Sequence, residues 1–269
     1  MKAILLPVEP NSGIDAAFAS AGLLAERFDG EVECITLKPS IVDFIAPDPV
    51  VVVLPQTGYS EAEAVKIARD RFAACTASRN ATLFRWSSRP PIDDAGLASL
   101  SRVFDITVVG RPGVGRNEPR MTTLEAALFE SGRPILMTPP VAPKSIGTNV
   151  LVHWNASTET ARVIMDAMPI LRRAERVTLL SVEGNMVAGP KPADMLGYLA
   201  RHGIKGSETY LKPTAKGGAG VAILAEARKI GADLIIKGAY TQSRLKQMIF
   251  GGATQHILQT ADIPVMLSH

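Results

Sequence analysis

The segment Asp233-Leu234-Ile235-Ile236-Lys237-Gly238 (DLIIKG) has a counterpart in the first half of the chain, Asp105-Ile106-Thr107-Val108-Val109-Gly110 (DITVVG). In both, a short apolar run ends at a glycine, which is typical of a buried strand followed by a turn. Each segment leads through a loop and a helical pattern to another short apolar run, at 133–137 in the first half and at 263–267 in the second. The chain therefore repeats itself in order, and this repeat decides the fold.

Further out from these segments, the two halves also begin alike. Short apolar strands are predicted at 3–9 and 150–155, and second strands at 32–37 and 177–182. Amphipathic helices are predicted between them, at 14–28 and at 157–171, where Pro169 is expected to kink the pattern. Strands that alternate with helices indicate parallel sheets. We predict an α/β fold with two tandem units, each an open, mainly parallel five-stranded sheet with helices on both faces.

The boundary between the units is expected in the proline-rich segment 139–145. We assign residues 1–140 to the first unit and residues 146–269 to the second. The last strand of each unit, Ile135-Leu136-Met137 and Val265-Met266-Leu267, should lie at a sheet edge with unpaired backbone groups. We predict that these two strands pair, which would make one chain a pseudo-dimer; a further homodimer is left open.

Composition excludes several classes of protein. The 269 residues are 46% hydrophobic and 20% charged, as in an ordinary globular protein, and aromatic residues make up only 5%. No basic run alternates with aromatic residues, so we expect no nucleic-acid partner. No apolar run is long enough to span a membrane, and Cys34 and Cys75 are expected to be reduced, buried thiols, so we expect a cytoplasmic protein without a membrane partner.

Charge is divided unevenly between the halves. Residues 1–145 contain 15 basic and 17 acidic side chains, whereas residues 146–269 contain 14 basic and 9 acidic ones. The basic half also contains Gly238, directly after a predicted strand, and Gly251-Gly252-Ala253-Thr254 at the start of a predicted helix. Glycines in these places leave backbone amides open to an anion. A small anionic ligand is therefore expected in the second half.

These features together resemble tandem universal stress proteins over about the whole chain, most strongly over residues 220–269. The resemblance implies an adenine-nucleotide alpha-hydrolase-like fold and binding of ATP, with or without Mg²⁺. Nucleotide-binding members have a glycine, two residues, a second glycine, nine residues, and then a glycine followed by serine or threonine. Here Gly238 and Gly251 match, but Thr241 replaces the second glycine and Gly252 replaces the serine or threonine. Ala253 follows at the helix start, and Thr254 offers a hydroxyl group two residues after Gly252.

The resemblance places four further residues at the same pocket. Asn155 stands where the family has an aspartate that faces the nucleoside, and Val182 matches the backbone position that contacts the adenine edge. Lys237 precedes the first glycine, beside the ribose, and His153 matches a pocket position that is usually proline. Three of them also have an ordinary structural alternative: Lys237 and Asn155 as strand-end residues, and His153 as a packed core histidine. Gly238 has one too, as a simple turn glycine.

The first half departs further from the pattern. Aligned on Pro134 and Pro264, residues 121–124 (Met-Thr-Thr-Leu) stand in place of 251–254, and Glu125 and Glu130 join the helix that should face the phosphate. Side chains then crowd the cradle and carboxylates repel an anion. We expect no nucleotide in this half.

No catalytic constellation is recognisable in the sequence. There is no nucleophile elbow, no paired acidic motif for Mg²⁺-dependent phosphoryl transfer, and no metal-ligand spacing of Cys and His. The first hypothesis is a stress-response regulatory protein that binds ATP in its C-terminal unit, with at most slow hydrolysis. The second is a member that binds no nucleotide and acts as an interaction scaffold or binds another small ligand. An adenylate-using enzyme is the least favoured hypothesis.

Overall fold

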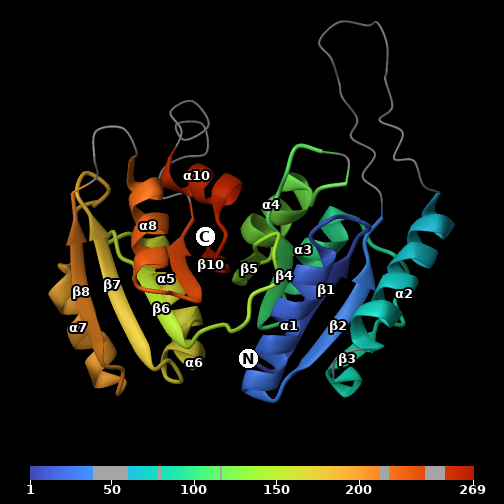
Figure 1. The fold of residues 1–269 in the computed structure, drawn as a ribbon, viewed down its shortest axis with the longest axis horizontal. Helices are drawn as coiled ribbons and strands as arrows, with labels where there is room; N and C mark the ends of the chain where they lie inside the picture. Colours follow the sequence, from blue (N-terminus) through green and yellow to red (C-terminus); the bar gives the residue numbers. More distant parts are fainter. Residues whose placement is uncertain (39–59, 78–79, 116, 213–217, 240–251) are drawn as a thin grey trace, which may run out of the picture.

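The computed structural model of the protein describes residues 1–38, 60–77, 80–115, 117–212, 218–239 and 252–269. Ten strands form one sheet in the order β3-β2-β1-β4-β5-β10-β9-β6-β7-β8 (Figure 1). The strands of the first half are β1 (Ala3–Val8), β2 (Glu31–Thr36), β3 (Phe84–Trp86), β4 (Ile106–Gly110) and β5 (Ile135–Thr138). Those of the second are β6 (Asn149–His153), β7 (Arg176–Val182), β8 (Gly206–Leu211), β9 (Leu234–Gly238) and β10 (Val265–Ser268).

The two halves have the same strand order, and all pairs within each half are parallel. Between the halves, β5 and β10 pair antiparallel, with Met137 opposite Val265 and Ile135 opposite Leu267. The predicted α/β fold with five-stranded, mainly parallel units is confirmed. The predicted pairing of the two last strands is also present, and it joins the units into one continuous ten-stranded sheet.

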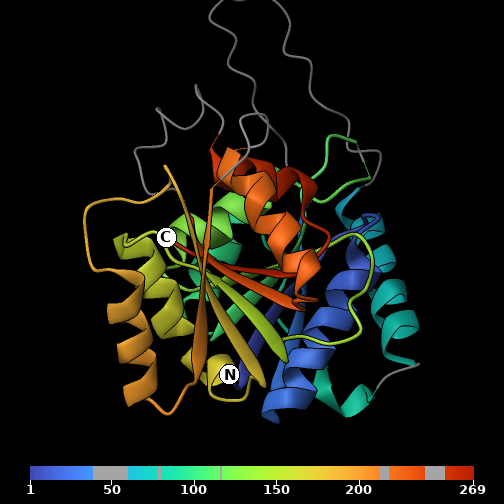
Figure 2. The ribbon, with the colours of Figure 1, turned by 60° about the vertical axis from the view of Figure 1, so that its left-hand side comes forward.

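Helices cover both faces of the sheet, as Figures 1 and 2 show. One face carries α1 (Ile14–Phe28), α2 (Glu61–Ala77), α5 (Thr158–Asp166), α6 (Met168–Leu171) and α7 (Pro192–Arg201). The other carries α3 (Asp94–Ser101), α4 (Met121–Glu130), α8 (Gly218–Lys229) and α10 (Ala253–Thr260). Because both faces are covered, most of the strands read as nearly continuous apolar runs. Pro169 has the expected effect, since the helical pattern of 157–171 is broken at Ala167 and Pro169 lies at the start of α6.

The aspartate that opens each repeated strand has a structural role. Asp105 accepts hydrogen bonds from the amides of Lys2 and Ala3, at 2.5 and 3.1 Å. Asp233 accepts equivalent bonds from the amides of Thr148 and Asn149, at 3.0 and 2.9 Å. In both halves the carboxylate therefore fixes the start of the neighbouring first strand, which explains why the repeated segment begins with this residue.

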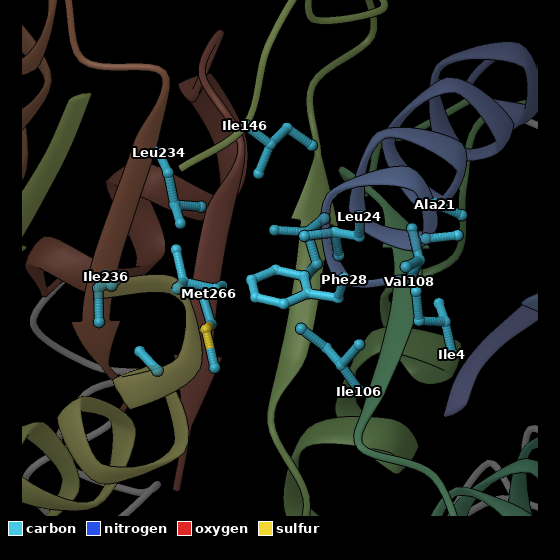
Figure 3. Close-up of a cluster of buried hydrophobic side chains, with 14 of the residues drawn as sticks. Ile4, Ala21, Leu24, Phe28, Ile106, Val108, Ile146, Leu234, Ile236 and Met266 are labelled. Atoms are coloured by element: carbon cyan, nitrogen blue, oxygen red, sulfur yellow. The ribbon is translucent and has the colours of Figure 1, made fainter. Parts of the chain in front are cut away.

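The junction between the halves has an apolar core and a polar clamp. Leu136 and Met266 are opposite each other in the strand pair, and both are completely buried. They belong to a cluster that includes Phe28 of α1 and side chains of the second half (Figure 3). At the surface, Arg27 donates to the carbonyl oxygen of Arg173 at 2.6 Å, and Arg173 donates in return to the carbonyl oxygen of Arg27. The two arginines thus tie α1 to the end of α6.

The strand junction gives a stability prediction. Leu136→Ala and Met266→Ala should each lower the free energy of unfolding by about 2–5 kcal/mol, because each leaves a cavity in a buried, packed position. Urea unfolding is the measurement. Val141→Ala is the matched control, since Val141 is 78% exposed in the connector, and its effect should stay within about 0.5 kcal/mol. If the two junction variants lose no more stability than this control, the junction is not packed as described.

Candidate functional site

The candidate site lies at the carboxyl ends of β6 and β9. These strands are neighbours, and the chain continues from them in opposite directions along the sheet, which is where α/β sheets usually bind ligands. His153 ends β6, and Lys237 lies opposite it in β9, so their side chains are on the same face of the sheet. That face is the one covered by α8 and α10. Two basic side chains therefore lie side by side under the start of α10.

Lys237 is a buried cation held by neutral groups. Its side chain is 4% exposed, and its Nζ donates to the carbonyl oxygen of Gly238 and to Oγ1 of Thr254, both at 2.7 Å. Among the described residues, no carboxylate lies within ion-pair distance of this Nζ. Burial lowers the pKa of Lys237 to about 8, against the weaker opposing attraction of Glu159. The side chain is therefore mainly charged at neutral pH, without a full counter-charge.

His153 is buried beside this lysine, with 1% of its surface exposed. In the described part of the chain, neither ring nitrogen has a well-formed hydrogen bond. Burial, and then the charge of Lys237, lower the pKa of His153 to about 3, whereas the nearby side chain of Asn185 opposes this shift. The ring is therefore neutral at pH 7. His153 is thus a packed core histidine, which is the structural alternative given in the sequence analysis. Its two ring nitrogens nevertheless lack hydrogen-bond partners among the described residues.

The matching pair of the first half is apolar. The registers Leu5–Thr107 and Leu151–Ile235 align the two halves, so that Pro7 stands in the place of His153 and Val109 in that of Lys237. Sequence repetition in itself would predict apolar residues at both positions. The basic pair is therefore a feature of the second half that its fold does not require.

The start of α10 adds a favourable environment for an anion. Gly252 is the N-cap and has no side chain to accept a hydrogen bond from the first turn. Uncapped amides and the helix dipole together amount to roughly half a positive charge at this end. Gly252 and Ala253 also line an open hollow of about 370 Å³ between the first turns of α8 and α10. Its other lining residues are Gly218, Ala219, Gly220, Gln255, His256 and Gln259.

Gly238 is required by packing. A Cβ atom built on Gly238 would lie 2.6 Å from the amide nitrogen of Thr160 and 2.7 Å from the carbonyl carbon of Glu159. The first turn of α5 therefore passes directly over this glycine. The ordinary structural alternative for Gly238 accounts for the glycine without a ligand, although its carbonyl oxygen also holds Lys237.

Asn155 and Val182 have their oxygen atoms engaged within the protein. Oδ1 of Asn155 accepts from the amide of Ser157 at 3.2 Å and from Oγ1 of Thr160 at 3.0 Å, which orients the start of α5. The carbonyl oxygen of Val182 accepts from the amide of Asn185 at 3.1 Å in the turn after β7. Of the predicted site residues, the structure thus brings Lys237, Gly238 and Thr254 into direct contact and places Gly252 and Ala253 beside them. Thr241 and Gly251 lie outside the described residues.

Glu159 was not recognised from the sequence. It belongs to the first turn of α5, acts electrostatically on Lys237, and has one buried carboxylate oxygen, Oε2, without a partner among the described residues. The sequence signal was weak, because an acidic residue directly after the N-cap Ser157 is common in helices for electrostatic reasons alone. Its place near Lys237 depends on the packing of α5 over Gly238.

The corresponding crevice of the first half is closed by the chain itself. Arg120 reaches into it and pairs with Glu9 and, at 3.1 Å, with Asp94. Pro119 covers Gly110 so closely that a Cβ atom there would be 2.5 Å from Cγ of the proline. The remaining cavity holds about 20 Å³, roughly the space of one water molecule. Burial raises the pKa of Glu9 despite the opposing effect of Arg120.

The crowding of this half comes only in part from the residues that the sequence indicated. Of residues 121–124, which were expected to crowd the cradle, Met121 and Thr122 are exposed on the outside of α4. Thr123 is buried, lines the crevice and donates from Oγ1 to Asp94 at 2.9 Å. Pro119 and Arg120, immediately before the helix, fill the rest of the crevice. The sequence alignment with the second half did not predict this, because it compared helix starts and not the loops that lead into them.

No three His, Cys, Asp or Glu side chains of the described ranges gather as metal ligands would. None of the described helices combines the length and apolar character that a membrane span requires.

Comparison with known proteins is consistent with this architecture. Residues 205–269 match the Universal stress protein family. Over 46 residues the chain is 39% identical to the stress response protein NhaX of Bacillus subtilis (strain 168), a stretch that covers 17% of this chain and 28% of that relative. The family resemblance is thus confirmed in sequence over the C-terminal segment.

Solved structures extend the likeness of fold to the whole chain. A universal stress protein from Archaeoglobus fulgidus DSM 4304 has a TM-score of 0.70 at 17% identity, over 99% of this chain and 95% of that one. A putative universal stress protein from Pseudomonas aeruginosa UCBPP-PA14 has a TM-score of 0.59 at 13% identity, over 100% of this chain and 93% of that one. At these identities the likeness establishes the fold.

The buried histidine leads to a pH prediction. The folded-state pKa of His153, about 3, lies below its ordinary value of 6.5, so the unfolded chain binds a proton that the folded protein excludes. The stability of the protein should therefore fall as the pH drops from 6.5 toward 3, and the share due to His153 should be about 2 kcal/mol at pH 5.

Urea unfolding at pH 7 and pH 5 tests this share. His153→Gln, which does not titrate, should lose about 2 kcal/mol less between the two pH values than the wild type does. His202→Gln is the matched control, since His202 is exposed, and it should retain the wild-type pH dependence. An equal loss in wild type and His153→Gln would show that the ring is not buried in its neutral form.

Proposed function

We propose that this chain, with its universal stress protein fold and its family match over residues 205–269, is a cytoplasmic stress-response regulatory protein. In this proposal its second unit, residues 146–269, binds one adenine nucleotide, ATP with or without Mg²⁺, with little or no catalysis. The observation that carries the proposal is the buried ammonium group of Lys237 at the uncapped start of α10.

A buried cation without a counter-ion is costly unless a ligand supplies the opposite charge. Desolvating an ionised amine costs several kcal/mol, and neutral hydrogen-bond acceptors offset only part of this. Lys237 has two such acceptors, Gly238 O and Thr254 Oγ1. A phosphate group at the start of α10 would give both the ammonium and the open amides an anionic partner. The second half is also the half with a positive net charge.

Each predicted residue has a role in this proposal. The amides that follow Gly252 and the hydroxyl of Thr254 hold phosphate oxygens, and Lys237 neutralises their charge. Gly238 allows α5 to pack close to the site. Asn155, two residues after the end of β6, and Val182, at the end of β7, are assigned to the nucleoside in this proposal. The residues outside the described ranges, Thr241 and Gly251, would complete the loop around the phosphates.

One nucleotide per chain is expected because the two crevices differ. In the first half, Arg120 already has two carboxylate partners, and the free space is about that of one water molecule. A phosphate there would have to displace Glu9 and Asp94, which would leave two carboxylates without their shared partner. Such an exchange is unfavourable by several kcal/mol.

Little catalysis is expected for a chemical reason. His153 is neutral with a pKa of about 3, so it is a very weak base, and Lys237 is engaged as a hydrogen-bond donor. Neither residue is suited to activate a water molecule. ATP turnover should therefore remain below about 1 s⁻¹, the lower end of ordinary enzyme rates.

A second candidate function is an interaction scaffold that binds no nucleotide, or a protein for another small ligand. The hydrogen bonds of Lys237 within the protein favour this second function, because the ammonium group already donates to Gly238 O and Thr254 Oγ1. Native mass spectrometry of the purified protein, with identification of any released nucleotide after denaturation, distinguishes the two. Bound adenine nucleotide supports the first function, whereas failure to bind at millimolar ATP supports the second.

A pair of substitutions at matched positions tests the site. Gly252→Glu should abolish ATP binding in calorimetric titration at fixed salt and Mg²⁺, because the carboxylate would occupy the phosphate position and repel the anion. Thr122→Glu puts the same side chain at the exposed position of the first half that the sequence alignment matches to Gly252, and it should leave affinity and a stoichiometry of one unchanged. Unchanged affinity in Gly252→Glu, or two equivalent ATP sites in the wild type, would contradict the proposal.

The charge of Lys237 gives the binding a characteristic pH dependence. The pKa of Lys237 is about 8, so above this pH the free protein loses the charge. Binding of ATP must then be accompanied by uptake of a proton at Lys237, and ATP affinity should fall about tenfold between pH 7 and pH 9. Lys237→Arg keeps its charge in this range and should lack this decline, whereas Lys237→Met should bind weakly at both values. Parallel titrations of the three proteins at the two pH values are the measurement. The same decline in wild type and Lys237→Arg would exclude Lys237 as its source.

A further inference from the structure

The outer strand β8 is an unpaired edge of the sheet. It is last in the strand order, and among the described strands it pairs only with β7 (Figures 1 and 2). Six residues long, it has no proline, and most of its side chains are exposed, including Glu208 and Tyr210, of which Tyr210 is 52% exposed. The opposite edge, β3, has three residues. In the described part of the sheet, β8 is thus the longer free edge, and such edges readily accept another strand.

The backbone of β8 shows which residues can bond outward. The carbonyl oxygen of Leu211 accepts from the amide of Glu183 beyond β7, so Leu211 is directed toward the sheet. In a parallel ladder, alternate residues bond to the same side. Ser207 and Thr209 therefore also bond toward β7, whereas the N–H and C=O groups of Glu208, Tyr210 and Lys212 point away from the sheet.

We propose that β8 pairs antiparallel with β8 of a second copy of this chain, about a twofold axis at Tyr210. In a twofold pairing, outward-bonding residues must face outward-bonding residues, which permits only a few registers. A register centred on Glu208 places two carboxylates opposite each other, and one centred on Lys212 does the same with two ammonium groups. The register centred on Tyr210 places Glu208 opposite Lys212 of the second copy, twice, and the two tyrosine rings together. Registers centred on Thr209 or Leu211 also place outward-bonding residues opposite each other, but they set Glu208 or Lys212 against Tyr210 and bring no opposite charges together.

Charge complementarity therefore favours the register centred on Tyr210, with a second copy of the chain as the partner. Opposite charges and aromatic pairs directly across a strand pair are stabilising, whereas like charges in these positions are destabilising. Gly206, also in the outward-bonding set, carries no side chain that could interfere, and a Cβ atom built on it would lie 2.9 Å from Cδ2 of Leu196 in α7. The dimer would extend the ten-stranded sheet through both chains and leave the site at β6 and β9 uncovered.

A charge exchange tests the pairing in the full-length protein. The association state is measured by sedimentation or light scattering over a range of protein concentrations and at low and high salt. Glu208→Lys and Lys212→Glu should each raise the dimer dissociation constant at least about tenfold, since each creates two like-charge pairs. The double variant Glu208→Lys/Lys212→Glu should restore dimerisation. Glu175→Lys is the control, since it makes the same charge change at an exposed position outside β8.

A backbone variant provides an independent test. Tyr210→Pro removes an outward N–H group without removing a bond to β7, so it should abolish the dimer and leave a folded monomer, as judged by circular dichroism. A wild-type protein that is monomeric at every concentration would overturn the proposal. The proposal would also be overturned if the protein forms a dimer that is weakened neither by the single charge variants nor by Tyr210→Pro, because the interface would then lie elsewhere.

Discussion

The antiparallel pairing of β5 with β10 is the constraint on which the rest of the architecture depends. Without it, each half would present an open apolar strand with unpaired backbone groups, and Leu136 and Met266 would lose their contact across the strand pair. With it, two five-stranded sheets become one, α1 packs against side chains of both halves, and Arg27 and Arg173 reach each other's backbone. The position of each crevice relative to the other follows from this single pairing. It also explains why β3 and β8 are the strands left at the outside.

The two crevices show how one scaffold can be given opposite properties. In the first half, apolar Pro7 and Val109 line the strand ends, and an arginine with two carboxylate partners fills the space above them. In the second, His153 and Lys237 replace the apolar pair, and the helix above begins without a capping side chain. The closed crevice is satisfied by its own charges. The basic one has charge and hydrogen-bonding capacity that its own described residues do not satisfy.

The sequence predicted those features that depend on local pattern and on repetition. Strand endings at Gly110 and Gly238 indicated the α/β units, the similar last strands indicated their pairing, and Pro169 indicated the helix break, because each is encoded within a few residues. Features that depend on packing between distant segments could not be predicted in this way. That α5 passes over Gly238, that Arg120 turns into the first crevice, and that Glu159 comes near Lys237 all result from helices docking on the sheet. Thr241 and Gly251, on which the loop prediction also depended, lie outside the described residues.

The order of the strands along the chain has a consequence for synthesis on the ribosome. The first unit contains all of β1 to β5, yet the strand that covers β5 is β10, whose residues 265–268 are made last among the ten. The first unit must therefore wait through translation of the whole second unit with an apolar edge uncovered. During that interval a nascent chain is most prone to pair with another nascent chain through β5. Slow translation of the second half, or loss of chaperones, should thus reduce the yield of native protein more than the stability of the finished fold would indicate.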